Sequence, residues 1–288
     1  MKPHRAFINL PKSFWAAIRT IGQKCGYTDR NTGQVKVPSI NEIERAYQEL
    51  RLDVGKLKGI NGNVSEYASQ IIRYCEYRAE VLNGFVKPRL MNVTRAKAEF
   101  RMLKRKLKPK CPLPINKQKG KKKSPNYFTG IVNMLIESVI KSQQCDFDPR
   151  ELTTVTVGGL PLRTLARRID GAFPSAVNPI AVWEVKEYYH TTTFGSRVAD
   201  GVYETLLDGM ELEELRVSEN QSILHYLMVD AYFTWWVCGR SYLCRIVDML
   251  HMGYVDEVFF GYEVIESLPR TVAEWVNRLK AKTFYIER

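Results

Sequence analysis

A segment rich in proline, glycine and lysine, residues 109–125, divides the chain into two parts with different patterns. Before it, apolar residues recur at spacings of three and four, which is typical of amphipathic helices. After it, strand-like and helix-like stretches alternate, which predicts helices packed around a sheet. We therefore expect a mostly helical region over residues 1–125 and an α/β domain over residues 126–288, with a mixed central sheet flanked by helices.

The helical pattern of the first part is clearest at three places. Ser39 and Glu42 have the spacing of a capping box, which predicts that a helix begins there. Two further helices are expected over about residues 64–83 and 91–108, and the polar face of the last one is dense with Lys and Arg. The second part is expected to contain strands at about residues 162–173 and 180–189.

Charge is distributed unevenly between the two parts. Residues 1–125 carry 28 Lys and Arg against 9 Asp and Glu, a net charge of +19, whereas residues 126–288 carry 15 against 22, a net charge of −7. A basic region beside an acidic one indicates a polyanion-binding region joined to a region with another task. A nucleic-acid phosphate backbone is the expected polyanion, because its regular negative charge attracts such a region; a basic face that only keeps the chain in solution is the alternative. The candidate DNA contacts share one helix face or lie in the 109–125 segment: Arg95, Arg101, Lys104, Arg105, Lys121, Lys122 and Lys123.

Several classes of protein do not fit this sequence. No apolar run approaches the roughly 20 residues needed to span a bilayer. Residues 1–15 lack the continuous apolar stretch of a signal peptide. The six cysteines show no metal-ligand spacing. We therefore expect a cytoplasmic protein with reduced cysteines, without a zinc site and without a membrane partner.

The most informative stretch is residues 167–189, in which two strand-like runs flank a turn-rich middle. If the runs form a hairpin centred on Val177, Asp170 lies directly opposite Glu184, with Cβ atoms about 4.5–5.5 Å apart. Two facing carboxylates are destabilising unless a cation bridges them or one of them keeps a proton. Oxygen ligands without histidine or cysteine favour Mg²⁺, with Mn²⁺ as a substitute, over zinc.

Lys186 lies two residues after Glu184, so its side chain points to the same face of the strand. An ammonium group beside a metal-bound water can orient that water. Two carboxylates, a metal ion and a lysine on one face therefore suit metal-assisted hydrolysis of a phosphodiester. The alternative is a solvated strand face with cross-strand ion pairs, because alternating charges are common on exposed strands.

A resemblance to a known superfamily rests on Asp170-Gly171 and Trp183-Glu184-Val185-Lys186. These residues resemble the motif of the PD-(D/E)xK nucleases, especially type II restriction endonucleases, over roughly residues 127–262. Ile169 stands where the superfamily has its nominal proline. The resemblance implies a restriction-endonuclease-like fold in which Asp170 and Glu184 bind Mg²⁺ and Lys186 positions the attacking water.

The same resemblance implies a glutamate on the helix before the hairpin that assists the metal site, and Glu137 has that placement; a solvated helix face is the alternative. The implied function is site-specific cleavage of double-stranded DNA that leaves 5′-phosphate ends. A homodimer is expected, with one active site for each strand. Two other functions stay open: a nuclease with the same core that acts in repair, recombination or transposition, and a non-catalytic nucleic-acid-binding protein.

Overall fold

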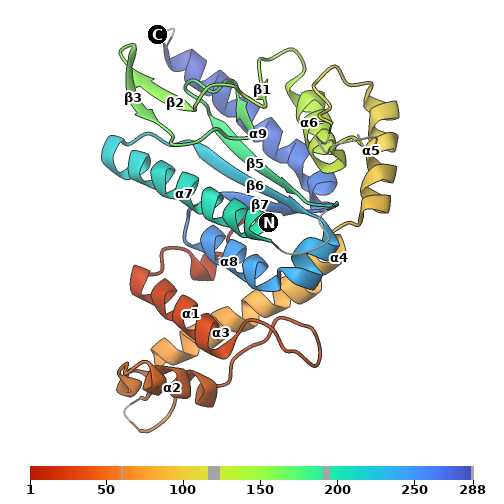
Figure 1. Ribbon diagram of the computed structural model, residues 1–288. Helices are drawn as coiled ribbons and strands as arrows, with labels where there is room; N and C mark the ends of the chain where they lie inside the picture. The colour runs from red at the N-terminus through yellow and green to blue at the C-terminus, as the bar shows by residue number, and fades with distance from the viewer. Residues whose placement is uncertain (60, 116–123, 191–194, 287–288) are drawn as a thin grey trace.

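A five-stranded sheet lies between two layers of helices in the computed structural model, which describes residues 1–59, 61–115, 124–190 and 195–286 (Figure 1). The strand order is β1-β4-β5-β6-β7; β1, β4 and β5 pair antiparallel, whereas β5, β6 and β7 pair parallel. The strands of this sheet are β1 (Asp146–Phe147), β4 (Gly171–Phe173), β5 (Ala181–Glu187), β6 (Leu224–Asp230) and β7 (Glu257–Phe260). A separate antiparallel ribbon consists of β2 (Thr154–Val157) and β3 (Leu160–Thr164). The expected mixed sheet is thereby confirmed.

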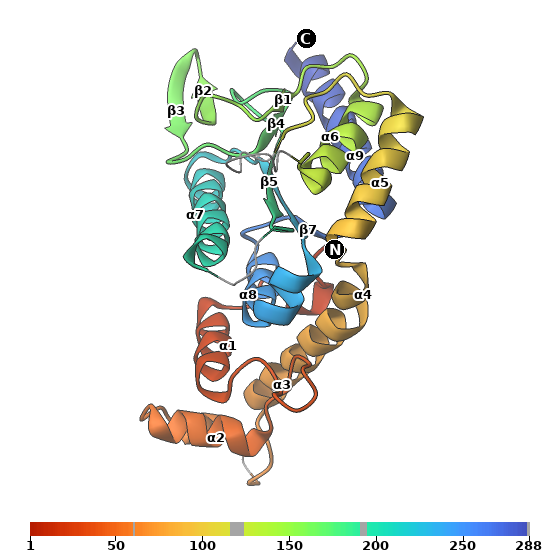
Figure 2. The same ribbon diagram turned by 45° about the vertical axis from the view of Figure 1, so that its right-hand side comes forward.

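Helices cover both faces of the sheet, which the turned view shows nearly edge-on (Figure 2). One layer consists of α5 (Val93–Leu107), α6 (Tyr127–Ile140) and α9 (Glu263–Ile286), and the other of α7 (Ser196–Glu219) and α8 (Arg240–His251). Successive side chains of β5 point alternately toward the two helix layers, because the side-chain period of a strand is two. Ala181 and Trp183 lie in the core with α6 and α9, whereas Val182 packs with Leu212 of α7. Glu184 and Lys186 share the α7 side with Val182.

The N-terminal helices form a smaller body that lies below α8 in both views (Figures 1 and 2). They are α1 (Lys12–Cys25), α2 (Ile40–Glu49) and α3 (Glu66–Glu80), which enclose a core of their own. The capping box at the start of α2 is confirmed, because Ser39 Oγ accepts a hydrogen bond from Glu42 N and the Glu42 carboxylate accepts one from Ser39 N. The remaining short segments are η1 (Arg5–Phe7), η2 (Val54–Leu57), η3 (Val81–Val86), α4 (Lys87–Arg89) and η4 (Phe233–Cys238).

Helix α5 belongs to the core of the sheet domain. Phe100 and Leu103 of α5 are buried in the same cluster as Phe128 and Ile131 of α6. The sequence pattern had grouped this helix with residues 1–125. The domain boundary placed at residue 125 stays a prediction.

One strand prediction was wrong. The expected single strand over residues 162–173 is broken, because β3 ends at Thr164 and β4 begins only at Gly171. Residues 165–170 leave the sheet to pack against α7: Leu165 and Ile169 are buried there, and Ala166 N donates a hydrogen bond to the Glu211 carboxylate at 3.1 Å. This detour carries Arg167 underneath α7.

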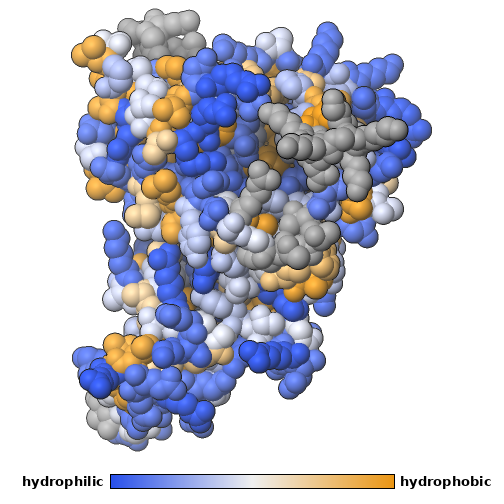
Figure 3. All heavy atoms as spheres, in the orientation of Figure 1, coloured by the Kyte–Doolittle hydropathy of each residue, from blue (hydrophilic) through white to orange (hydrophobic). Residues whose placement is uncertain are grey.

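The surface gives no sign of an extended apolar face on the side seen in Figure 3. Hydrophilic residues dominate that view, and the hydrophobic ones form small groups. Among the described residues, no helix combines the length and apolar character that crossing a bilayer requires. All six cysteines are free thiols, as the sequence predicted.

Candidate active site

A cleft of about 610 Å³ opens between β5, the loop before β4 and the first half of α7. Its charged lining residues are Arg167, Asp170, Glu184, Lys186, Glu187, Asp200 and Glu204. The three residues that the sequence singled out as the catalytic set, Asp170, Glu184 and Lys186, therefore meet in one cleft.

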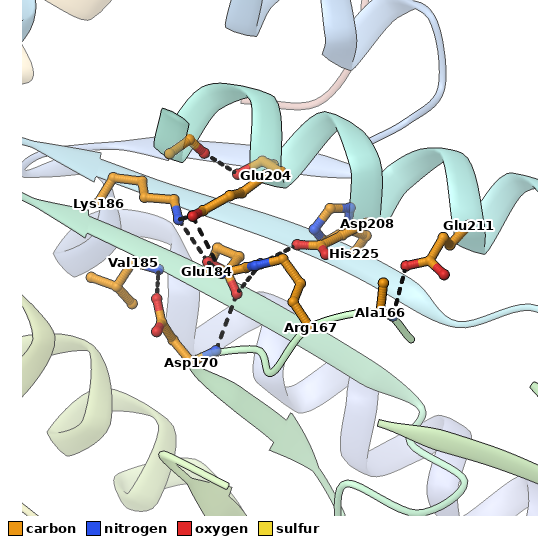
Figure 4. A network of polar contacts seen from close by, with 12 residues as sticks. Ala166, Arg167, Asp170, Glu184, Val185, Lys186, Glu204, Asp208, Glu211 and His225 are labelled. Carbon is orange, nitrogen blue, oxygen red and sulfur yellow. Dashed lines mark hydrogen bonds and ion pairs between the residues drawn. The ribbon is translucent and has the colours of Figure 1, made fainter. Parts of the chain in front are cut away.

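Asp170 and Glu184 face each other at the start of the β4–β5 hairpin (Figure 4). Gly171 pairs with Trp183, which is the register of a hairpin centred on Val177 and brings the preceding Asp170 opposite Glu184. Asp170 N donates a hydrogen bond to Glu184 Oε1 at 3.2 Å, and Val185 N donates one to Asp170 Oδ2 at 2.8 Å. Backbone groups thus hold both carboxylates in place.

The glycine after Asp170 is needed because the Trp183 indole lies over it. A Cβ atom at Gly171 would be 2.1 Å from the indole ring of Trp183, which no side chain can occupy. Trp183 is itself fixed by stacking on Trp275 of α9, with ring centroids 5.5 Å apart. The Asp-Gly step therefore couples the position of the carboxylate to the packing of the sheet on α9.

Lys186 reaches the same cluster from two residues further along β5. Its Nζ lies 2.7 Å from Glu184 Oε2 and 3.4 Å from Glu204 Oε2. Burial lowers the pKa of the Lys186 ammonium, but the carboxylates of Glu184 and Asp170 raise that pKa more, so it lies above its ordinary value. Lys186 is therefore a fixed cation that donates hydrogen bonds, and it does not serve as a proton acceptor.

Arg167 is a member of the cluster that the sequence analysis missed. Its guanidinium lies 3.2 Å from Glu184 Oε1, 2.5 Å from Asp208 Oδ2 and 3.4 Å from Glu204 Oε2. Nothing in the local pattern marks Arg167. Two of its partners had a signal, because Glu204 and Asp208 are four residues apart and so share one face of α7.

Carboxylates outnumber cations in this cluster. Among the residues that the structure describes, the cations of the cluster are Arg167 and Lys186, and its carboxylates are Asp170, Glu184, Glu204 and Asp208. Burial and the Glu184 charge raise the pKa of Asp170 to about 6 and that of Asp208 to about 7. Burial also raises the pKa of Glu184, but Lys186 and Arg167 lower it more, so it lies below its ordinary value. The excess negative charge therefore destabilises the ionised forms of Asp170 and Asp208, the two carboxylates whose pKa is raised.

The donor set fits a hard divalent cation held by few protein ligands. Within the described ranges, no group of three or more His, Cys, Asp or Glu residues has the geometry of a metal site. Mg²⁺ usually binds through only one or two carboxylates and takes its other ligands from water and substrate phosphates. Asp170 Oδ1 accepts no hydrogen bond from the described residues, and a dication would offset the excess charge. Asp170 and Glu184 are therefore the residues that could hold Mg²⁺.

The excess charge at Asp170 predicts that the variant Asp170→Asn is more stable than the native protein at neutral pH. Because the folded state raises the pKa of Asp170 from 3.8 to about 6, it binds this proton more tightly than the unfolded chain does. The contribution of Asp170 therefore lowers the free energy of unfolding as pH rises from about 4 to 6, and the free energy does not recover this contribution above pH 6. Without metal at pH 7.5, we expect Asp170→Asn to raise the free energy of unfolding by about 3 kcal/mol.

Urea unfolding in EDTA between pH 4 and 8 measures this difference, which should shrink towards zero at pH 4. The matched control is Asp148→Asn, because the side chain of Asp148, just after β1, is 71% exposed and does not line the cleft. If Asp170→Asn is the less stable protein at pH 7.5, its surroundings already neutralise the Asp170 carboxylate, and the electrostatic case for a cation at this site fails.

Glu137 lies away from the cleft. It belongs to α6, on the opposite face of the sheet, where its carboxylate accepts hydrogen bonds from Lys110 N at 3.1 and 3.0 Å. The β5 carboxylate that meets α6 is Glu187, which accepts a hydrogen bond from Thr129 N at 2.9 Å. The structure therefore does not bring Glu137 together with Asp170.

The candidate DNA contacts on α5 are solvent-exposed: Arg95, Arg101, Lys104 and Arg105. Arg95 lies over the ring of Tyr262, with its guanidinium carbon 4.3 Å from the ring centroid. α5 belongs to the helix layer across the sheet from α7 and the cleft (Figure 2). Lys121, Lys122 and Lys123 fall outside the described residues.

Comparisons with known proteins give family relationships without a function. A family model described as a domain of unknown function (DUF7687) matches residues 91–275. A second model, also described as a domain of unknown function (DUF7690), matches residues 1–85. No curated protein and no solved structure matches the chain.

Proposed function

The chain belongs to the DUF7687 family, and we propose that it is a Mg²⁺-dependent endonuclease that hydrolyses phosphodiester bonds of double-stranded DNA. The observation that carries the proposal is the meeting of Asp170, Glu184 and Lys186 in one acidic cleft at a β-hairpin. The motif resemblance and the mixed sheet support the finer proposal of a restriction-endonuclease-like fold. The net charge of +19 on residues 1–125 supports a polyanionic substrate.

Each charged residue of the cleft has a distinct role in this proposal. Asp170 and Glu184 would hold Mg²⁺, or Mn²⁺ in its place. When bound, such an ion polarises a phosphoryl oxygen and lowers the pKa of a coordinated water. The Lys186 ammonium orients the attacking water and stabilises negative charge that develops on the phosphate. Arg167 keeps Glu184 in position from its other side.

Cleavage of both strands needs two such clefts. We therefore propose a homodimer that acts as a type II restriction enzyme, because a two-fold symmetric assembly presents one active site to each strand of a palindromic sequence. The products would carry 5′-phosphate ends.

Incubation of the full chain with plasmid and phage DNA, with Mg²⁺ or with EDTA, tests this function. We expect discrete fragments with Mg²⁺ and intact DNA with EDTA. Glu184→Gln should abolish cleavage, because a neutral amide neither holds a dication nor fixes Lys186 as strongly. The matched control is Glu219→Gln, at the exposed end of α7, which should cleave like the native chain.

Two other results would change the conclusion. A smear of Mg²⁺-dependent products contradicts site-specific cleavage and indicates a non-specific or structure-directed nuclease. DNA that is bound but stays intact with Mg²⁺ and with Mn²⁺ contradicts hydrolysis altogether and leaves a nucleic-acid-binding protein.

A further inference from the structure

Another pocket, of about 350 Å³, lies where the N-terminal helices meet the sheet domain. Its lining residues are Arg19, Gln23, Tyr27, Val202, Tyr203, Leu206, Arg245, Asp248 and Met249. They come from α1 and the chain just after it, from α7 and from α8. The pocket thus combines residues from the two regions that the two family models match.

The pocket carries uncompensated positive charge. Among the described residues, neither Arg19 nor Arg245 forms an ion pair with a carboxylate. Arg19 donates to the sulfur of Met252 at 3.6 Å, and Arg245 donates to the Tyr203 hydroxyl at 2.6 Å. Two guanidinium groups that line one pocket without an acidic partner favour binding of an anion.

The one carboxylate in the lining is already neutralised by other residues. Both oxygens of Asp248 accept hydrogen bonds from Arg78, at 2.9 and 3.1 Å, and Oδ1 also accepts one from the Tyr74 hydroxyl at 2.6 Å. Asp248 is therefore unavailable to Arg19 and Arg245. No other carboxylate of the described residues lines the pocket to balance these two arginines.

Aromatic and apolar groups adjoin this charge. The Tyr203 ring is 49% exposed, and Val202, Leu206 and Met249 supply an apolar wall. The guanidinium of Arg245 lies over the ring of Tyr242, 4.8 Å from its centroid, which fixes the direction of the guanidinium. An exposed tyrosine ring beside arginines suits a planar base attached to a phosphate, because bases stack on aromatic rings and guanidinium groups bind phosphates.

We propose that this pocket binds a mononucleotide, with the phosphate on Arg19 and Arg245 and the base against Tyr203 and the apolar wall. The volume of about 350 Å³ is at the lower end of small-molecule sites and suits one nucleotide rather than a longer chain. The site does not depend on the proposed nuclease function. It does share α7 with the cleft, because Val202, Tyr203 and Leu206 line the pocket while Asp200 and Glu204 line the cleft.

Titration calorimetry of the full chain in EDTA and without DNA tests the proposal. The probes are AMP, GMP, CMP and UMP, with adenosine, ribose 5-phosphate and inorganic phosphate as partial ligands. At least one mononucleotide should bind saturably and more tightly than any of the partial ligands. Arg19→Gln and Arg245→Gln should each raise its Kd about tenfold or more, because each removes a charged hydrogen bond to the phosphate.

Two controls separate binding from folding. Arg19 is exposed, so Arg19→Gln leaves the fold intact, and Arg30→Gln, an exposed arginine beyond the pocket, should bind like the native chain. Arg245→Lys keeps the charge and should lose less affinity than Arg245→Gln. The proposal is overturned if no mononucleotide binds, if inorganic phosphate binds as tightly, or if Arg19→Gln and Arg245→Gln leave the Kd unchanged. Binding of a DNA oligonucleotide through Arg19 and Arg245 without binding of any mononucleotide would also overturn it.

Discussion

Replacement of Lys186 by methionine is expected to lower the rate of Mg²⁺-dependent DNA cleavage by about 10²–10³-fold while Mg²⁺ binding is retained. The ammonium lies 2.7 Å from Glu184, and its side chain is only 8% exposed, so water cannot replace it without a change in the cleft. Methionine fills a similar volume without charge. The variant therefore loses a positive charge beside the attacking water but keeps both carboxylates that would hold the ion.

Single-turnover cleavage measures the rate, and titration calorimetry with Mg²⁺ measures binding to the same protein. Lys280→Met is the matched control, because Lys280 is exposed on α9, in the helix layer across the sheet. If Lys186→Met cleaves at the native rate, Lys186 is a structural partner of Glu184 and takes no part in the reaction. If Mg²⁺ binding disappears together with cleavage, Lys186 acts by shaping the metal site, and its role beside the water is wrong.

The geometry of the hairpin was predictable because it depends on local rules. A strand has a side-chain period of two, and a hairpin centre fixes every pair, so Val177 as the centre places Asp170 opposite Glu184 and puts Lys186 on the same side as Glu184. The β4–β5 register agrees with this centre. The capping box of α2 was predictable for the same reason, since Ser39 and Glu42 satisfy each other within one helical turn.

The part of the site that escaped prediction depends on contacts between distant segments. Arg167 is fixed by Asp208 and Glu204, which follow it by some forty residues on another element. Periodicity within residues 162–173 cannot reveal that the chain leaves the sheet to reach α7. The apolar residues Leu165 and Ile169 fit a strand pattern equally well, but their burial is against α7.

The last helix was underpredicted for a related reason. The sequence pattern alone predicts a last helix over residues 271–281, because Pro269 has no N–H group and is common at the start of a helix. In the structure α9 begins at Glu263 and contains Pro269. Val264 and Leu268, on the turns before the proline, are fully buried in the core with α6, and this tertiary packing outweighs the lost backbone hydrogen bond.

The body formed by α1, α2 and α3 is joined to the sheet domain by a buried ion pair. Arg78 of α3 and Asp248 of α8 are each 2% exposed, and the guanidinium donates to both carboxylate oxygens. Tyr74 adds a hydrogen bond to the same carboxylate. Aromatic rings cover the arginine, because its guanidinium carbon lies 5.2 Å from the ring centroid of Tyr27 and 5.6 Å from that of Tyr74.

Removal of one partner of this pair is expected to cost about 3–5 kcal/mol of unfolding free energy. Arg78→Met leaves the Asp248 carboxylate buried with only the Tyr74 hydroxyl as a donor, and Asp248→Leu leaves the Arg78 guanidinium without its counter-charge. The cost is large because a buried charge has lost its hydration and then also loses its partner. Urea unfolding at pH 7 measures it for both variants.

The double variant Arg78→Met/Asp248→Leu distinguishes a buried charge penalty from a loss of packing. If the penalty is electrostatic, the double variant removes both charges and should recover most of the stability, because apolar replacements of a buried ion pair are often neutral or stabilising. If the double variant loses as much as the two single variants together, the coupling energy between the sites is close to zero, and each side chain contributes through its own packing rather than through the ion pair. Lys24→Met serves as the control, because Lys24 pairs with Glu49 at a partly exposed position within the N-terminal body, where an ion pair contributes about 1 kcal/mol or less.

Since Asp248 also lines the proposed nucleotide pocket, an unpaired Asp248 in Arg78→Met would add a negative charge there. The same variant should therefore bind a mononucleotide more weakly than the native chain.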